Sequence, residues 1–168
     1  GAYLHMNDFL MRQIRSELED AVGQENVSVR QSDKISHSVD NFWLPRMYAD
    51  RGLIPPLADI IVYPGSTQEV SKVLVIANYY RLPVYPWGGG GGSQGGALPL
   101  KGGILLDTKR MNKIIAFDEQ SMTVTAQTGI VYTQLEYYAN ERGYSLMHYP
   151  SSINCSTLGG FLAHNGIG

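Results

Sequence analysis

Glycine is concentrated in one short segment of this chain, residues 83–96, which read PVYPWGGGGGSQGG. Seven of the nine residues at positions 88–96 are glycine. Glycine loses more backbone entropy on folding than any other residue, so such a run does not serve stability. It is useful where the backbone passes close to a ligand and successive amide N–H groups face an anion. The run therefore predicts a loop that binds a phosphate-bearing ligand.

Two common phosphate-binding motifs do not account for this loop. Residues 90–95 match the G-x-G-x-x-G fingerprint of dinucleotide-binding folds, with Asp107 downstream. That fingerprint needs a helix whose N-terminus faces the pyrophosphate, and residues 95–103 cannot begin one. A P-loop fails as well, because Lys101 has no adjacent serine or threonine. The remaining interpretation is a loop that binds a diphosphate through its amides alone.

A second loop of small residues is expected to close over the same ligand. Residues 150–160 read PSSINCSTLGG, and residues 165–168 read NGIG. Small residues permit close approach, and short hydroxyls donate hydrogen bonds to phosphate or ribityl oxygens. Taken alone, this segment is equally consistent with a surface loop that has no ligand. The predicted ligand-binding residues are Pro86, Gly88, Gly89, Gly90, Gly91, Gly92, Ser93, Gly95, Gly96, Pro150, Ser151, Ser152, Thr157, Gly159, Gly160, Asn165 and Gly166.

The residues before the glycine run predict an N-terminal helix and then an irregular segment. Asn7 or Asp8 can cap this helix, and Gly23 ends it. Residues 27–29 are a candidate short strand. No periodicity is sustained over residues 31–56, where aspartate, proline and glycine interrupt the pattern.

A strand, a helix and a second strand then lead into the glycine run. Residues 60–63 are an apolar strand, and Ser66 with Glu69 matches a capping box at the start of the helix. Residues 83–86 form the second strand, so these elements make a βαβ unit whose two strands pair in parallel. The helix residues expected to be buried are Val70, Val73, Leu74 and Ala77.

The residues after the glycine run predict a strand, a hairpin and a helix. Residues 104–106 are the strand, and residues 114–117 and 122–127 are the two arms of the hairpin. The helix that follows ends at Gly143. Residues 145–147 are expected to form a brief strand before the second loop.

Composition excludes several classes of function. The net charge of −2 gives no electrostatic case for nucleic acid or for an anionic membrane. No apolar run is long enough to form an integral membrane segment. The single cysteine excludes an intramolecular disulfide framework and is typical of a reducing cytoplasm, so a cytoplasmic location is expected. The four histidines show no ligand spacing, and no metal site is expected.

The two ends of the chain indicate a piece of a longer protein. Residues 1–5 read like a tag remnant or cloning scar and are left out of the fold prediction. The last residues, 165–168, stop within the second glycine-rich segment, and a domain rarely ends where a turn needs a continuation. We therefore expect a truncated N-terminal fragment.

Several motifs, in order and with regular spacing, connect the glycine run to a known family. Residues 56–168 resemble the first part of the FAD-binding domain of the flavoenzyme superfamily that includes vanillyl-alcohol oxidase. The subgroup is similar to the glycolate oxidase flavoprotein subunit, D-lactate dehydrogenase and alkylglycerone-phosphate synthase. The matching segments are 62–67, 69–70, 77–78, 83–84, 95–99, 101–104, Asp107, 110–114, 157–160 and 165–166.

The resemblance implies an α+β fold with FAD between two subdomains. The first subdomain, residues 56–129, would contain the βαβ unit, and the second, residues 130–168, would be incomplete. Residues 6–55 would form the N-terminal helix and an irregular lead-in. The ADP part of FAD would be held by the two loops, and the isoalloxazine would lie toward a separate substrate domain.

Some residues depart from the family pattern. The family often has arginine after the strand proline and Thr-Ser within the glycine run, where this chain has Trp87, Gly91 and Gly92. Covalently flavinylated members carry a histidine at the position of Gly91, so non-covalent FAD is expected. Cys155 lies near the position of a flavin-bonding cysteine in doubly attached relatives. Without the partner histidine, we expect Cys155 to pack beneath its loop, and His148 to be a hydrogen-bonded loop residue.

The resemblance also implies a reaction. The intact protein would be an FAD-dependent oxidoreductase that oxidises a small organic acid, such as a 2-hydroxy acid, by hydride transfer to the flavin. This chain would supply cofactor-binding residues and no catalytic base, so by itself it is expected to bind FAD weakly or not at all and to have no turnover. Two alternatives remain open: a non-catalytic subunit whose FAD site a partner chain completes, and a module that binds another diphosphate nucleotide without redox chemistry.

Overall fold

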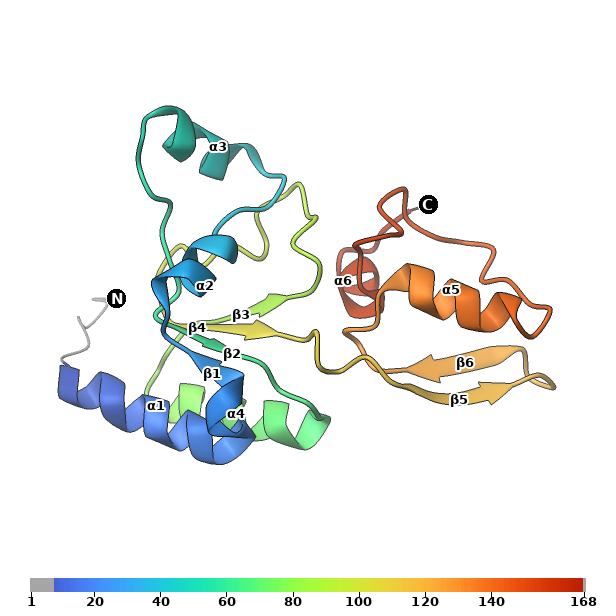
Figure 1. The fold of residues 1–168 in the computed structure, drawn as a ribbon, viewed down its shortest axis with the longest axis horizontal. Helices are drawn as coiled ribbons and strands as arrows, with labels where there is room; N and C mark the ends of the chain where they lie inside the picture. The colour runs from blue at the N-terminus through green and yellow to red at the C-terminus, as the bar shows by residue number, and fades with distance from the viewer. Residues whose placement is uncertain (1–7, 168) are drawn as a thin grey trace.

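The computed structural model describes residues 8–167, which form two groups of elements (Figure 1). Residues 1–5, expected to be a tag remnant, and Gly168 lie outside the described residues. The first group is a four-stranded sheet with helices on both faces, and the second is a hairpin with two helices. The carboxyl ends of the parallel strands of the sheet face the second group (Figure 1).

The sheet has the strand order β1-β2-β4-β3. β1 (Val27–Ser28) is antiparallel to β2 (Ile60–Val62), whereas β4 (Ile104–Asp107) pairs in parallel with β2 on one side and with β3 (Val84–Trp87) on the other. The parallel direction of the expected βαβ unit is therefore confirmed. Its two strands do not pair with each other as expected, because β4 lies between them. A parallel sheet is buried on both faces, which explains the continuous apolar runs of β2 and β4.

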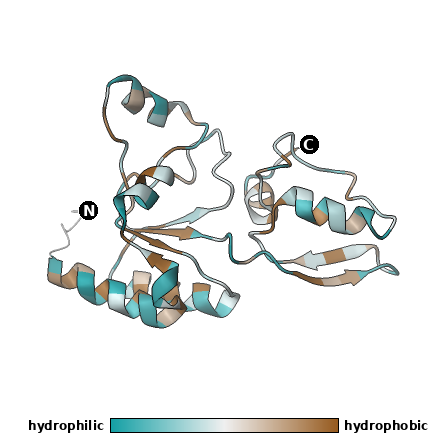
Figure 2. Ribbon diagram, in the orientation of Figure 1, coloured by the Kyte–Doolittle hydropathy of each residue, from teal (hydrophilic) through white to brown (hydrophobic). Residues whose placement is uncertain are grey.

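Two helices cover one face of this sheet. α1 (Asp8–Val22) and α4 (Thr67–Tyr79) lie against each other, and the apolar residues of each helix pack against the strands. Figure 2 shows that hydrophobic and hydrophilic residues alternate along these helices, whereas the strands beside them are largely hydrophobic. Gly23, with a φ of 93°, ends α1 as expected, and a short 3-10 helix, η1 (Gln24–Asn26), follows it. The core residues of this layer are Ile14, Leu18, Val22, Val27, Ile60, Val62, Val73, Ala77, Ile104 and Leu106.

The start of α4 follows the capping-box prediction with one change. Ser66 Oγ accepts a hydrogen bond from Glu69 N at 3.2 Å. The Glu69 carboxylate accepts its bond from Gly65 N at 2.6 Å, one residue earlier than in the standard box. The expected burial of Leu74 is wrong, because its side chain is 47% exposed. One residue along a helix is a turn of about 100°, so Leu74 lies beyond the buried edge that Val73 marks.

The segment on the other face of the sheet contains two helices that the sequence did not predict. α2 (Gln31–Ser36) and α3 (Trp43–Asp50) are six and eight residues long, too short to show a sustained period. Pro45 suggested a break, but it lies in the first turn of α3, where a missing N–H leaves no helical bond unmade. The core residues on this face are Ala58, Ile61, Trp87 and Leu105.

The second group of elements begins with the expected antiparallel hairpin. Its strands are β5 (Ile114–Asp118) and β6 (Thr123–Ala126), and α5 (Tyr132–Asn140) lies along it (Figure 1). The last helix, α6 (Leu158–Ala163), begins inside the segment expected to be the second loop. Among residues 8–167, no helix is both long and apolar enough to cross a membrane.

The expected strand over residues 145–147 is wrong. Ser145 Oγ and Leu146 N donate hydrogen bonds of 2.7 and 2.9 Å to the Glu136 carboxylate. This side chain of α5 thus holds the segment in place of a neighbouring strand.

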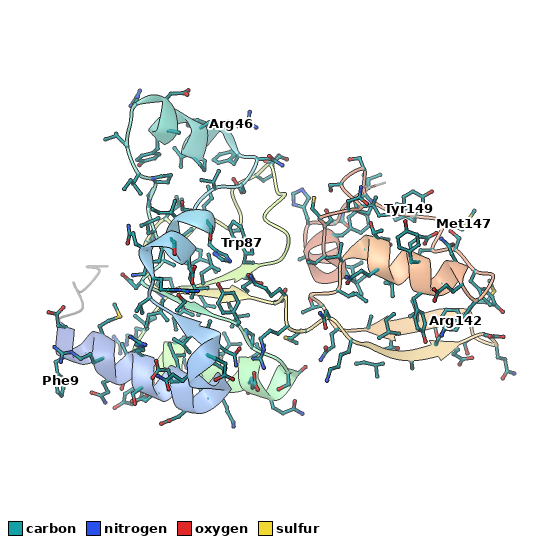
Figure 3. The ribbon with its side chains drawn as sticks, in the orientation of Figure 1. Phe9, Arg46, Trp87, Arg142, Met147 and Tyr149 are labelled. Carbon is teal, nitrogen blue, oxygen red and sulfur yellow. The ribbon has the colours of Figure 1, made fainter. Side chains whose placement is uncertain are left out.

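Aromatic contacts join the hairpin to α5. The rings of Phe117 and Tyr138 meet edge to face, with 5.9 Å between their centroids. Arg142 extends the stack, because its guanidinium carbon lies 3.6 Å from the centroid of Tyr138 (Figure 3). These contacts cross the subdomain boundary expected at residue 129.

A matched pair of leucine substitutions tests this packing. Leu18 is fully buried on α1, whereas Leu74 is 47% exposed on the neighbouring α4. We expect Leu18→Ala to lower the free energy of unfolding by about 2–5 kcal/mol, because it leaves a cavity in the core. Leu74→Ala should change it by less than about 0.5 kcal/mol. Urea unfolding followed by circular dichroism measures both, and equal losses would contradict the packing of α4.

Candidate functional site

The two glycine-rich loops touch each other through their backbones. We call residues 88–96 the first loop and residues 150–160 the second loop. A Cβ atom on Gly88 would collide with the Thr157 hydroxyl, and one on Gly89 would collide with the Cys155 carbonyl oxygen. No other amino acid fits at these two positions without moving the second loop, so the contact itself requires glycine.

Two further glycines have a conformational reason. Gly90 and Gly95 have φ values of 64° and 73°, a region that side chains rarely permit. A Cβ atom on Gly90 would also meet the Trp87 indole, and one on Gly95 would lie 2.8 Å from the Phe42 ring. Both positions therefore serve the shape of the first loop.

Three glycines of the first loop have no such reason. Nothing lies within 4 Å of a Cβ atom built on Gly92 or Gly96, and on Gly91 it would make only an ordinary contact, at 3.8 Å from Cys155 Sγ. None of the three has a positive φ. The side-chain positions of Gly92 and Gly96 face open space, which is what close approach of a ligand requires.

The amides of the first loop are available for such a ligand. Within residues 8–167, none of the N–H groups of residues 88–93 donates a hydrogen bond to a protein acceptor. The carbonyl oxygens behave differently: Gly92 O accepts from Asn41 N at 3.0 Å, and Gly91 O accepts from Asn41 Nδ2 at 3.2 Å. A run of free N–H groups beside open space fits an anion such as a diphosphate.

The second loop is only partly available. The N–H groups of residues 151–154 donate to no acceptor within the described residues. Ser152 Oγ lies 2.6 Å from Ser156 Oγ, and Thr133 Oγ1 donates to Ile153 O at 2.8 Å, which anchors the loop to α5. Pro150 is buried and Ser151 is exposed.

Several residues predicted to bind the ligand also have structural roles. Thr157 caps α6, because its hydroxyl accepts from Gly160 N at 3.2 Å. Gly159 N donates to Thr128 O at 2.8 Å, and a Cβ atom on Gly159 would collide with the Thr128 hydroxyl. The amides of Gly159 and Gly160 are therefore already in use.

Two others end the same helix. Asn165 has a φ of 51°, the left-handed conformation that commonly follows a helix, and Gly166 N donates to Phe161 O at 3.0 Å. Pro86 lies within β3, where it is paired with Leu106 of β4. A ligand-binding role for all of these residues stays a prediction.

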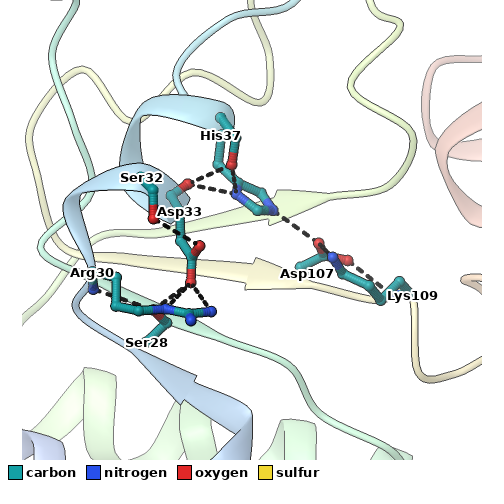
Figure 4. A network of polar contacts seen from close by, with 8 residues as sticks. Ser28, Arg30, Ser32, Asp33, His37, Asp107 and Lys109 are labelled. Carbon is teal, nitrogen blue, oxygen red and sulfur yellow. Dashed lines mark hydrogen bonds and ion pairs between the residues drawn. The ribbon is translucent and has the colours of Figure 1, made fainter.

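The sequence did not predict a buried polar cluster, which lies at the carboxyl end of β4. His37 Nε2 lies 2.9 Å from the carboxylate of Asp107, and both side chains are at most 9% exposed (Figure 4). Lys109 Nζ lies 3.2 Å from the same carboxylate. The His37 ring packs on Trp87, with 5.1 Å between centroids. His37 and Asp107 are 70 residues apart, and no sequence signal links them.

Both ring nitrogens of His37 lie within hydrogen-bond distance of an oxygen atom. His37 Nδ1 lies 2.8 Å from Asp33 O, which can only accept, and Nε2 faces the Asp107 carboxylate. These two contacts fix the orientation of the His37 ring. Burial, with the carboxylates of Asp33 and Asp107, raises the pKa of neighbouring Tyr63 to about 12. A hydrogen bond from Ser28 lowers the pKa of Asp33.

Two residues singled out for covalent or flavin contact lie in exposed positions. Cys155 is exposed, with its Sγ 3.4 Å from Ser152 O, so the expectation that it packs beneath its loop is wrong. The carbonyl oxygen of His148 accepts a 2.6 Å bond from the Tyr132 hydroxyl, and its ring lies 5.6 Å from that of Phe161. Met147 and Tyr149, on either side of His148, are exposed (Figure 3).

Comparisons with known proteins agree on one family. The FAD binding domain family matches residues 58–168. The chain is 28% identical to the glycolate oxidase subunit GlcD of Bacillus subtilis over 95% of this chain and 32% of that protein. It is 36% identical to the alkyldihydroxyacetonephosphate synthase of Dictyostelium discoideum over 67% of this chain and 19% of that protein.

Solved structures give the same result. A structure of alkyldihydroxyacetonephosphate synthase superposes with a TM-score of 0.86 at 30% identity, over 94% of this chain and 32% of that one. The α+β fold expected from the resemblance is thereby confirmed. The chain spans only a fifth to a third of these relatives, 19% to 32% of their length. It belongs to the FAD binding domain family found in flavin oxidoreductases of the glycolate oxidase, D-lactate dehydrogenase and alkyldihydroxyacetonephosphate synthase type, and its cofactor is FAD.

Proposed function

We propose that this chain holds the ADP part of FAD between its two loops. The observation that carries the proposal is the row of unused N–H groups at residues 88–93, beside glycines whose side-chain positions are open. Six successive amides without a protein acceptor would be unfavourable unless water or a ligand accepts their hydrogen bonds. A diphosphate supplies strong acceptors at the required spacing.

The predicted site residues divide into two kinds under this proposal. Residues 88–93 and 151–152 have free amides and would contact the phosphates or ribose. Gly95, Thr157, Gly159, Gly160, Asn165 and Gly166 would set the shape of the loops, with Pro86, Gly96 and Pro150 lining them. The expected subdomains, residues 56–129 and 130–168, would then contribute one loop each.

The reaction of the whole protein is also a proposal. FAD, when bound, supplies hydride and electron transfer, and we propose a small 2-hydroxy acid as substrate, which the similarity to a glycolate oxidase subunit supports. The residues of this chain bind and orient the cofactor, and none is assigned as a catalytic base. Attachment of FAD is proposed to be non-covalent, and a cytoplasmic location rests on the single cysteine.

The first test measures FAD binding and turnover by the chain itself. With only part of the relatives' length present, we expect weak binding, visible as flavin fluorescence quenching at high protein concentration. The sequence also allowed no binding at all, but both loops meet in the structure and the first has free amides, so we expect binding to be retained. Adding glycolate or D-lactate should not bleach the flavin absorbance. Substrate-dependent bleaching would contradict the assignment of this chain to cofactor binding alone, and a complete lack of FAD binding would contradict the proposed function.

Alanine at two glycines separates loop shape from ligand contact. Gly89→Ala should lower the free energy of unfolding by about 1–3 kcal/mol, because its Cβ overlaps the Cys155 carbonyl. Gly92→Ala has open space and should leave stability unchanged. Because a methyl group would occupy the proposed phosphate position, Gly92→Ala should weaken FAD binding by about tenfold or more, roughly 1.4 kcal/mol. Unchanged affinity in Gly92→Ala would place the phosphates elsewhere.

An engineered disulfide tests the approach of the two loops. A Cβ atom on Gly91 would lie 3.8 Å from Cys155 Sγ, which is close enough for a disulfide after a small shift. We expect Gly91→Cys to oxidise to an intramolecular disulfide, measured as the loss of both free thiols and unchanged oligomeric state. Gly96→Cys is the control, since nothing lies within 4 Å of its Cβ position. If both variants kept free thiols, the loops would not be in contact.

A further inference from the structure

A partly buried segment before α3 lies against the first loop. We call residues 37–42 the strap. His37, Ser38 and Asp40 within it are 7%, 1% and 5% exposed, so the strap is fixed in the fold although it has no regular structure. The strap belongs to the lead-in, residues 31–56, over which no periodicity is sustained, and the family match begins only at residue 58.

Both ends of the strap are anchored. His37 is held by the Asp107 carboxylate at the end of β4, at 2.9 Å. At the other end the Phe42 ring lies beneath Gly95, where a Cβ atom would be 2.8 Å from it. Asp40 Oδ1 accepts from Phe42 N at 2.9 Å, a tight turn that presents Asn41 between them.

Asn41 donates hydrogen bonds to two carbonyl oxygens of the first loop. Its backbone N–H donates to Gly92 O at 3.0 Å, and its side-chain amide donates to Gly91 O at 3.2 Å. Within one trans peptide, the C=O and the following N–H point in opposite directions. The N–H groups of Gly92 and Ser93 therefore point away from Asn41, and both residues are exposed.

We propose that Asn41 is a positioning residue for the diphosphate of FAD, a role that rests on the proposed function. By holding two successive carbonyl oxygens on the strap side, it fixes two successive N–H groups on the ligand side. Without these hydrogen bonds the glycine run would sample many peptide orientations, because glycine allows a wider range of backbone angles than any other residue. The strap thus preorganises the first loop, whose glycine-rich sequence would otherwise be flexible. Preorganisation lowers the conformational entropy that is lost on binding.

Substitutions at Asn41 test this role. Asn41→Ala keeps the backbone bond but removes the bond to Gly91 O, so we expect FAD and ADP to bind roughly 3- to 10-fold more weakly. Asn41→Asp places a carboxylate against that carbonyl and should bind still more weakly, because it attracts the Gly92 N–H to the wrong side. Because aspartate also adds a negative charge, the affinity of the alanine variant decides whether Asn41 is a positioning residue. Asn78→Ala, an exposed position on α4, is the matched control and should bind as the unchanged chain does.

The measurements are ADP affinity by calorimetry, FAD affinity by fluorescence, and the thermal unfolding midpoint of each variant. Weaker binding by Asn41→Ala with an unchanged midpoint supports positioning. Equal affinity of Asn41→Ala and Asn78→Ala overturns it while leaving the proposed function intact. If the unchanged chain binds neither FAD nor ADP, the proposed function fails first. A loss of affinity that merely follows a lowered midpoint assigns Asn41 a structural role and overturns the inference.

Discussion

The close backbone contact between the first and second loops constrains the rest of this structure. Gly88 and Gly89 approach Thr157 and the Cys155 carbonyl so closely that no Cβ fits between them. The two loops come from different groups of elements, so this contact ties the sheet to the hairpin and its helices. For the two backbones to meet, strand β3 must end at Trp87 and α6 must begin after Thr157.

The glycines of the first loop divide their work. Gly88 and Gly89 allow the contact, and Gly90 and Gly95 adopt left-handed turns. Gly92 and Gly96 leave open space, and a Cβ atom on Gly91 would make only an ordinary contact. This division explains why the run is longer than any single purpose requires. It also explains why a loop with free amides is not simply flexible: Trp87 and Phe42 pack under the turns, and Asn41 holds two carbonyl oxygens.

Much of this could be predicted from the sequence, because local signals were strong. The capping box of α4, the end of α1 at Gly23, the hairpin and the absence of a helix after the glycine run follow from residues near one another. The His37–Asp107 contact and the hydrogen bonds from Asn41 to the first loop join residues that are far apart in the chain. Sequence periodicity does not reveal such contacts. The burial of Leu74 was predicted wrongly, because an apolar residue next to a buried one is assigned to the core until its packing partner is known.

An amide-resolved NMR titration of the chain with ADP shows whether the first loop binds the diphosphate. It detects weak binding and reports each backbone N–H separately. We expect the largest chemical-shift changes on the amides of residues 88–93, with smaller changes at residues 151–154. Binding that shifts other amides and leaves residues 88–93 unmoved would contradict it.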